Sequence, residues 1–271
     1  MSVFSDRVAR LRKERKLTQR ELAEALEFSR QTVSNWEKGK IEPSVGVLLK
    51  IAEYFGITTD FLLGNEAYTT QYEGKYKQEG FYWGSKINRL AREVLRLIPP
   101  ERPLRLLEVG CGEGQAAVFF ARNGYHVTAF DIAASGLAKG RKLAKAAGVH
   151  VDFFQVDLLH HDLVNDYDVI YSTDVLEYVP PKKREQLLRS FRDHTTVGGL
   201  NVLDTFVEKS FIDVAPDWEH SKEFYWQTGE LFSHYRENWK FELCEETIFD
   251  CDSGGMPHQH CMDMIIARRM T

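Results

Sequence analysis

Three glycines and an aspartate give the strongest chemical signal in the sequence. Gly110, Gly112 and Gly114 follow an apolar run that begins at Leu104, and Asp131 ends the next apolar run. Because glycine has no Cβ, a ligand can approach the backbone closely at such a turn. A carboxylate that ends the following strand can accept two hydrogen bonds from a ribose diol. The G-x-G-x-G spacing differs from the G-x-G-x-x-G of nicotinamide enzymes, and a turn that binds nothing is the alternative.

The elements around these residues form a βαβ unit within a longer alternating pattern. Apolar runs alternate with amphipathic stretches, which is typical of a sheet with helices on both faces. We predict an α/β fold, a seven-stranded Rossmann-like domain preceded by a small all-α domain of five helices. The predicted strands are 104–109, 127–130, 151–157, 167–174, 200–206, 241–249 and 261–267, and the predicted helices between them are 116–122, 135–147, 181–195 and 229–239.

Residues 104–131 resemble motif I of class I S-adenosylmethionine (SAM) methyltransferases, and the resemblance to that class covers roughly residues 80–270. It implies that SAM is the cofactor, that Glu108 lies near its methionine end, and that Asp131 holds its ribose. Asp157 corresponds to the acid that meets the adenine amino group, with a capping role as the alternative. The cofactor-binding residues that the resemblance implies are Trp83, Glu108, Gly110, Cys111, Gly112, Asp131, Ile132, Asp157, Leu158 and Thr173.

The C-terminal pattern narrows the resemblance. Gly229-Glu-Leu, Tyr235, Trp239 and the final Met-Ile-Ile-Ala-Arg-Arg are similar to the tellurite-resistance methyltransferase branch. DNA methylation is disfavoured, because the fourth strand ends in Ser-Thr-Asp-Val rather than an Asn-Pro-Pro-Tyr-like motif and the chain has no Pro-Cys nucleophile. We therefore expect a small-molecule acceptor, with sulfur, selenium or tellurium favoured. If the acceptor is oxygen or nitrogen, Asp174 and His220 are the candidate bases, and a structural role is the alternative for each.

Two aromatic segments flank the predicted site. Residues 81–84 precede a helix over 86–97, and residues 207–228 hold Trp218, His220, Phe224, Tyr225 and Trp226. Aromatic walls exclude water and favour a polarisable acceptor or a sulfonium through cation–π attraction. We predict that the first segment covers SAM as a lid and that the second covers the acceptor. Packing in the core is the alternative for the first segment.

The residue types near the C-terminus would permit a soft metal ion to bind. Cys251, His258, His260 and Cys261 offer thiolate and imidazole ligands. Adjacent residues on a strand, however, point to opposite faces. We therefore predict ordinary hairpin residues and no metal.

Residues 1–65 contain five short amphipathic helices. Thr18 and Glu21 form a capping box, and Ser29 caps the next helix. Gln19, Leu22-Ala23, Val33, Trp36-Glu37 and Pro43 resemble the lambda-repressor/Cro (Xre) helix-turn-helix family. Glu27 stands where that family has glycine, and a left-handed conformation there costs about 1 kcal/mol.

That resemblance implies a DNA-binding homodimer. Double-stranded DNA is the expected partner, with Gln19 at a phosphate and a reading helix that presents Arg30, Gln31, Ser34 and Asn35 outward. A bundle used only for dimerisation is the alternative. Residues 1–64 carry 11 Lys and Arg against 9 Asp and Glu, whereas the remainder carries 24 against 31. Only the N-terminal part is therefore plausible as a nucleic-acid surface.

The whole pattern predicts three parts: a helix-turn-helix domain over 1–65, a linker over 66–80 and a methyltransferase domain over 81–271. No signal region opens the sequence and no apolar stretch is long enough to cross a bilayer, so we expect a cytoplasmic protein with free thiols and no membrane partner. The expected function is methylation of a small molecule by an enzyme fused to a transcription regulator. A non-catalytic transcription factor that senses SAM or a metabolite is the alternative.

Overall fold

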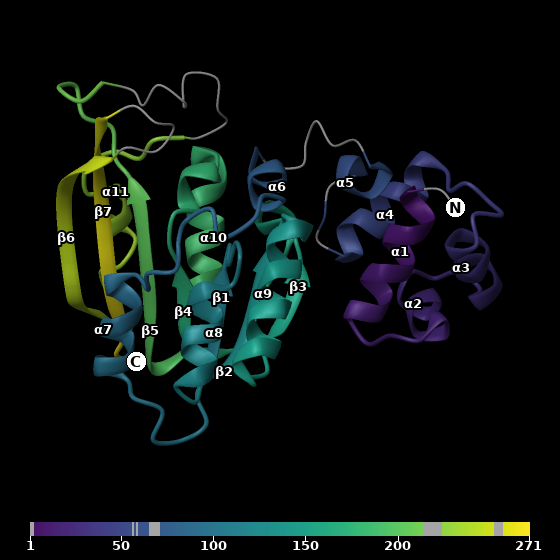
Figure 1. Cartoon of the computed structure of the whole chain (residues 1–271), viewed down its shortest axis with the longest axis horizontal. Coiled ribbons are helices and arrows are strands. Elements are labelled where there is room, and N and C mark those ends of the chain that lie inside the picture. Colours follow the sequence, from purple (N-terminus) through teal and green to yellow (C-terminus); the bar gives the residue numbers. More distant parts are fainter. Residues whose placement is uncertain (1–2, 56, 58, 65–70, 214–223, 252–256) are drawn as a thin grey trace.

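A computed structural model describes residues 3–55, 57, 59–64, 71–213, 224–251 and 257–271. Five short helices at the N-terminus form one part, and a mixed sheet flanked by helices forms the other (Figure 1). Among the described residues, no helix is long and apolar enough to cross a membrane.

The N-terminal part folds around its own apolar core. Its helices are α1 (Val3–Glu14), α2 (Gln19–Ala25), α3 (Arg30–Glu37), α4 (Val45–Phe55) and α5 (Thr59–Leu63). The predicted capping box at the start of α2 is confirmed, because the amide of Glu21 donates to Thr18 Oγ1 and the amide of Thr18 donates to the Glu21 carboxylate. Val33 and Trp36 of α3 lie buried in this core, as predicted.

The turn between α2 and α3 contains the predicted departure from glycine. Glu27 has a left-handed conformation with φ of 59°, and its carboxylate forms an ion pair with Lys50 of α4. Because this pair is exposed to solvent, it offsets little of the backbone cost. The turn keeps its left-handed geometry in spite of the side chain.

Seven strands form the predicted sheet, in the order β3-β2-β1-β4-β5-β7-β6. The first five strands pair in parallel, whereas β7 is antiparallel to both β5 and β6. The strands are β1 (Arg105–Val109), β2 (His126–Asp131), β3 (Asp152–Gln155), β4 (Tyr167–Ser172), β5 (Thr195–Phe206), β6 (Trp239–Cys251) and β7 (His258–Arg269).

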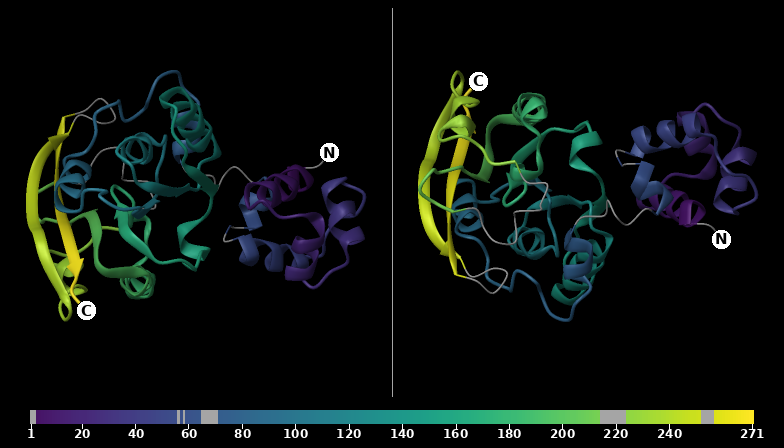
Figure 2. Two further views of the ribbon diagram at one scale, coloured as in Figure 1. Left: turned by 90° about the horizontal axis from the view of Figure 1, so that it is seen from below. Right: turned by 90° about the horizontal axis from the view of Figure 1, so that it is seen from above.

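Helices cover both faces of the sheet, as the two views of Figure 2 show. Along β1, Leu106 faces one core and Leu107 the other, which explains why this strand is apolar at successive positions. The first core is covered by α7 (Arg89–Leu97), α8 (Gln115–Arg122) and α9 (Ala134–Ala147), and the second by η3 (Leu176–Tyr178), α10 (Pro181–Asp193) and α11 (Glu230–Ser233).

Two boundaries differ most from the sequence prediction. The helix predicted over 229–239 is wrong in length, because α11 ends at Ser233 and Asn238 adopts a left-handed φ of 64° just before β6. Strand β5 begins at Thr195 rather than Leu200 and includes Gly198 and Gly199. Both errors arise where tertiary pairing, rather than local pattern, decides the backbone.

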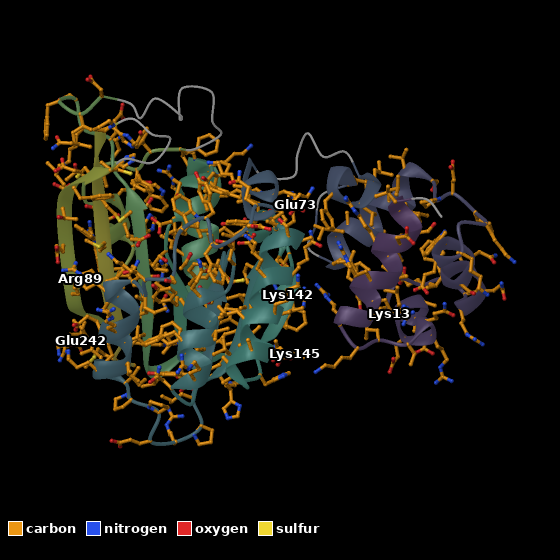
Figure 3. The ribbon with its side chains drawn as sticks, viewed as in Figure 1. Lys13, Glu73, Arg89, Lys142, Lys145 and Glu242 are labelled. Atoms are coloured by element: carbon orange, nitrogen blue, oxygen red, sulfur yellow. The ribbon has the colours of Figure 1, made fainter. Side chains whose placement is uncertain are left out.

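The predicted linker contains a helix, α6 (Gln71–Tyr76), that packs on the start of α9. The amide of Ser135 donates to Glu73 Oε2 at 3.1 Å, and its hydroxyl donates to the Glu73 carbonyl at 3.0 Å. Figure 3 labels Glu73 on α6, above α9 in that view. This segment is therefore attached to the α/β part.

The two parts touch at the β3 edge of the sheet. Arg10 of α1 donates to Gln155 Oε1 at 2.5 Å, and Lys16 lies 3.7 Å from Asp152. A short 3-10 helix, η2 (Leu158–His160), follows β3 on this side. The α1–α5 bundle therefore meets the sheet next to the strand that Asp157 follows.

Candidate functional site

A cavity of about 700 Å³ opens beyond the carboxyl ends of the parallel strands. Ligands of doubly wound sheets bind in this position. Each residue that the SAM resemblance implied lies in its wall, as does Asp174: Trp83, Glu108, Gly110, Cys111, Gly112, Asp131, Ile132, Asp157, Leu158, Thr173 and Asp174. Their role in binding stays a prediction, but the structure brings all of them to one site.

The glycine turn has a backbone that other residues would not adopt easily. Gly110 has φ of 71°, and a Cβ there would stand 2.2 Å from a methyl group of Val175. Gly112 has φ of 49°, and a Cβ there would stand 2.9 Å from the hydroxyl of Tyr76. The turn is thus glycine-specific both in conformation and in the space that its neighbours leave.

Asp131 ties the end of β2 to this turn. Its Oδ2 accepts a hydrogen bond from the Gly112 amide at 2.8 Å, and its Oδ1 accepts one from the Ala133 amide at 2.7 Å. Burial raises the pKa of Asp131 to about 6, and the two amide donors act against that rise. An ionised carboxylate offers about four lone-pair positions, so both oxygens can still accept a ligand hydroxyl.

Glu108, at the other end of the turn, is buried with only 5% of its surface exposed. Burial, and then repulsion from Asp131, raise the pKa of Glu108 to about 8. Its Oε2 has no hydrogen-bond partner in the described structure and the residue lines the cavity. A cationic or hydrogen-bond-donating group placed here would satisfy this oxygen. The cavity thus offers one carboxylate that can accept hydrogen bonds from a diol and a second that can attract a cation. These two groups fit the ribose and the amino group of SAM.

Tyrosines that the sequence reading did not assign to the site form part of its wall. Tyr72 and Tyr76 of α6 stack with ring centroids 5.6 Å apart, and the Tyr72 hydroxyl lies 2.9 Å from that of Tyr178. Both α6 tyrosines and Tyr178 line the cavity. Their spacing at i and i+4 on a polar segment was the available signal, because it places two rings on one side of a helix.

The lid predicted over 81–84 lies at the mouth of the cavity. Trp83 is 53% exposed and lines the cavity, while its Nε1 donates to the Tyr76 hydroxyl at 3.3 Å. A tryptophan that is half exposed is not part of the core, so the packing alternative does not describe it. The lid position agrees with the prediction.

An unpredicted buried acid anchors the lid to the glycine turn. Glu113, just after the turn, accepts from the amide of Tyr82 at 2.8 Å and pairs with Lys139 of α9 at 2.6 Å. Gln115 also donates to the Gly84 carbonyl at 2.9 Å. The lid backbone is therefore fixed to the same turn that would hold the cofactor.

Asp157 caps the turn after β3, which was the alternative for this residue. Its Oδ1 accepts from the Leu159 amide at 2.9 Å, and its Oδ2 lies 3.0 Å from the His160 ring. The residue also lines the cavity, so contact with an adenine stays a prediction.

Asp174 ends β4 in a left-handed conformation, with φ of 56°. The residue lines the cavity and is exposed to solvent there, while desolvation by the surrounding protein raises the pKa of its carboxyl group to about 6. Its amide donates to Asp204 Oδ1 at 2.7 Å. Asp204 is buried, and burial together with the Asp174 charge raises its pKa. Asp174 in the cavity wall and the buried Asp204 are thus neighbouring carboxyl groups, and the sequence analysis found only Asp174.

The outward face of α3 carries three of the four predicted base-reading residues. Arg30 and Gln31 are exposed, and Gln31 donates to Asn35 Oδ1 at 3.0 Å. The prediction that Ser34 points outward is wrong, because this residue is only 7% exposed. Its short side chain lies next to Val33 and is covered at the margin of the packed face.

Gln19, predicted to contact a phosphate, is held by a carboxylate. Its Nε2 donates to Glu37 at 2.8 Å, and Arg12 binds the same carboxylate at 2.6 and 3.1 Å. This network fixes the start of α2 against the end of α3. The Gln19 amide group would have to share its donors with a phosphate.

Comparisons with known proteins agree with both parts of this geometry. The family described as helix-turn-helix matches residues 8–62. The family described as methyltransferase domain matches residues 106–199. The chain joins a helix-turn-helix domain to a methyltransferase domain.

Individual relatives resemble the methyltransferase domain over part of their length. The chain is 24% identical over 176 residues to the probable SAM-dependent methyltransferase TehB of Haemophilus influenzae, covering 58% of this chain and 61% of TehB. It is 30% identical over 111 residues to the ubiquinone biosynthesis O-methyltransferase of Rickettsia conorii, covering 40% and 38%. The crystal structure of the same TehB matches at 20% identity with a TM-score of 0.60, over 73% of this chain and 65% of that one.

This chain therefore spans less than two thirds of the length of these relatives. The structural match shows a shared fold. The segment that matches the methyltransferase domain family, residues 106–199, contains the glycine turn and the carboxyl ends of β1 to β4.

Trp226 differs from the acceptor cover that was predicted for residues 207–228 of the methyltransferase domain. Trp226 is 1% exposed, its Nε1 donates to the Leu176 carbonyl at 3.1 Å, and the Arg184 guanidinium lies 4.2 Å from its ring. This tryptophan belongs to the second core, because it closes the underside of the β4–α10 connection. Phe224 is partly exposed, whereas Trp218 and His220 lie outside the described residues.

Proposed function

We propose that this protein is a SAM-dependent methyltransferase that acts on a small molecule and carries a DNA-binding regulator domain. One observation carries the enzymatic part. Asp131, bound to the Gly112 amide at 2.8 Å, and Glu108, with a buried unpartnered oxygen, lie in the wall of one 700 Å³ cavity. The name of the similar TehB supports SAM as the methyl donor.

The residues of the cavity would act by binding and orientation. SAM supplies an activated methyl group on a sulfonium. Asp131 accepts hydrogen bonds from the ribose, Glu108 attracts the amino group of the methionine end, and the rings of Tyr72, Tyr76 and Trp83 exclude water. Holding donor and acceptor in line removes much of the entropic barrier. The ring of Trp83, which lines the cavity and is partly exposed, also favours a cationic sulfonium through cation–π attraction to its face.

A thiol, selenium or tellurium compound is the acceptor class that we propose. Such an acceptor is polarisable and nucleophilic without a general base, and the cavity wall is mostly aromatic and apolar. The similarity to TehB supports this class, because it agrees with the resemblance to the tellurite-resistance branch. The similarity to an O-methyltransferase supports oxygen as the second class of acceptor. The observation that favours oxygen or nitrogen is Asp174, whose pKa of about 6 suits a general base near neutral pH.

Steady-state kinetics on an isosteric variant separates these two classes. Asp174→Asn removes the base but keeps a residue that tolerates the left-handed backbone. On a thiol, selenite or tellurite compound returned by a screen, we expect turnover to change by less than about fivefold, or about 1 kcal/mol. A thousandfold loss with unchanged SAM affinity would assign an oxygen or nitrogen acceptor instead. SAM binding without any turnover across the screen would favour the sensor alternative.

We also propose that the helix-turn-helix domain binds double-stranded DNA as a homodimer and places the chain in transcription regulation. Support comes from the exposed Arg30 and Gln31 and the partly exposed Asn35 on a capped helix. A guanidinium suits guanine, and amide groups suit adenine, in the major groove. Half-sites about one helical turn apart are then expected, and a footprint on the DNA upstream of the coding sequence measures them.

A further inference from the structure

The end of the β6–β7 hairpin brings three metal-binding side chain types together. Cys251 is the last residue of β6, and it pairs directly with His258, the first residue of β7. His260 follows two positions later on β7. Residues that are directly opposite, or two apart on one strand, project to the same face of a sheet. The hairpin register therefore places all three side chains on one side.

Their ligand atoms converge on a common point. A thiol sulfur and one ring nitrogen from each histidine all lie within 4.8 Å of one another. The two imidazole rings are nearly perpendicular, at 89°, with their Nε2 atoms 2.9 Å apart. One nitrogen of each ring and the thiol sulfur thus surround one small volume.

Aromatic packing holds one of these ligands in a fixed place. His260 is 4% exposed, and its ring centroid lies 4.8 Å from that of Phe206 and 5.6 Å from that of Phe249. Little rotamer freedom remains to be lost when such a ring binds an ion. Cys251 and His258 are partly exposed, so an ion can reach the site from solvent.

The spacing is close to that of a tetrahedral zinc site. Zn–N distances of about 2.05 Å and a Zn–S distance of about 2.3 Å require roughly 3.3 Å between nitrogens and roughly 3.6 Å between nitrogen and sulfur. The two nitrogens need to part by a few tenths of an ångström, and the thiol sulfur needs to approach them by at most about 1.2 Å. Side-chain torsions alone provide such movements. Three protein ligands leave the fourth position open to water or another small ligand.

The geometry points to a Zn²⁺ site formed by Cys251, His258 and His260, and we propose that the protein binds one zinc ion there. The sequence analysis set this possibility aside because His260 and Cys261 are adjacent. That argument excludes only Cys261, whose side chain belongs to the opposite face of the hairpin. There burial, and then the charges of Glu246 and Lys209, shift the pKa of its thiol. With Cys261 removed from the set, the other three satisfy the alternation of the strand.

This site is separate from the proposed SAM cavity. None of the three ligands belongs to the cavity wall. A measurement of zinc binding is therefore independent of a measurement of SAM binding, and a variant that loses one can still be tested for the other.

Cobalt and zinc titration of the full chain tests the proposal. The chain is prepared without a polyhistidine tag, stripped with a chelator, and titrated with Co²⁺ alone. We expect one Co²⁺ per chain, a thiolate-to-cobalt charge-transfer absorption band, and displacement of cobalt by one equivalent of Zn²⁺. Excess Zn²⁺ should raise the melting temperature by about 5 °C, because binding only the folded state stabilises it.

Matched variants distinguish the site from other thiols and from misfolding. Cys251→Ser should lose the charge-transfer band and the zinc-dependent melting shift, yet melt like the wild type without metal. Cys244→Ser, which alters an exposed cysteine of the same strand, should behave like the wild type. Sub-stoichiometric cobalt binding by the wild type, or a band and melting shift that persist in Cys251→Ser, would overturn the proposal.

Discussion

The raised pKa of Asp131 leads to a measurable dependence of SAM affinity on pH. In the free protein, burial raises this pKa from 3.8 to about 6, so the ionised form is disfavoured. Ribose hydroxyls donate hydrogen bonds to the ionised carboxylate, so bound SAM should lower the pKa again. Binding then releases a proton below pH 6. We therefore expect SAM affinity to rise with pH through this window, and the perturbation that removes the effect is Asp131→Asn.

The size of the effect follows from the two pKa values. If bound SAM returns the pKa to its ordinary value or below, about one Asp131 in eleven is ready to bind at pH 5 and about nine in ten at pH 7. The affinity should therefore rise about tenfold between these pH values, or about 1.4 kcal/mol. The same shift has a cost for the free protein: the carboxyl is harder to ionise when folded, so stability falls as pH rises from about 4 through 6.

Titration calorimetry of SAM at pH 5, 6 and 7 measures this rise in the wild type and in Asp131→Asn. The variant should bind at least tenfold more weakly at pH 7, because losing a contact to buried hydroxyls costs about 1–3 kcal/mol. Other groups also titrate, including Glu108 with its pKa of about 8 and the amino group of SAM. The ratio of the two affinities removes most of their contribution and should grow about tenfold from pH 5 to 7.

Two results would refute this reasoning. A ratio that stays constant with pH would show that Asp131 does not change its ionisation when SAM binds. Equal affinities of the wild type and the variant at pH 7 would show that this carboxylate makes no contact with the ribose, and the glycine turn would then be a structural feature alone.

Three further predictions concern single regions. Arg30→Ala combined with Asn35→Ala should abolish the specific footprint while leaving SAM binding unchanged, and an unaltered footprint would remove α3 from recognition. Glu27→Gly should raise the free energy of unfolding by up to about 1 kcal/mol in denaturant titrations, because glycine adopts the left-handed turn without strain; a loss of stability would mean that the ion pair of this glutamate outweighs the strain. Trp226→Ala should destabilise the fold by about 3–5 kcal/mol as a core truncation, whereas Trp83→Ala should lower turnover with little change in melting temperature; the reverse pattern would restore the acceptor role first assigned to residue 226.

Much of the site could be predicted because its residues follow strand ends that are visible in the sequence. Gly110, Gly112, Asp131 and Asp157 each end or follow an apolar run, and a parallel sheet brings such ends to one edge. The pattern therefore fixed both their identity and their proximity. The same logic located the capped helices of the N-terminal domain, where Thr18 supplies a local signal.

The residues that were missed depend on contacts distant in sequence. Tyr76 reaches the glycine turn only because α6 packs on α9, and Glu113 is buried only because Lys139 and the Tyr82 amide meet it. Trp226 was assigned to the wrong side for a similar reason, since Arg184 and the Leu176 carbonyl draw it into the second core. Composition and periodicity carry no information about such partners.

The outer strand β6 has a consequence for how two copies of this protein can meet. It is thirteen residues long and ends the sheet order, so one of its edges lacks a neighbouring strand among the described residues. A free edge of this length is a template on which a second sheet can extend itself. Four acids lie along it, namely Glu242, Glu245, Glu246 and Asp250. Three of these acids are in ion pairs, Glu242 with Lys240 and Arg268, Glu245 with Arg89 and Glu246 with Lys209, and a second edge would have to displace water from these charged groups. Self-association through continuous sheets is therefore opposed at this edge by the charged groups that line it.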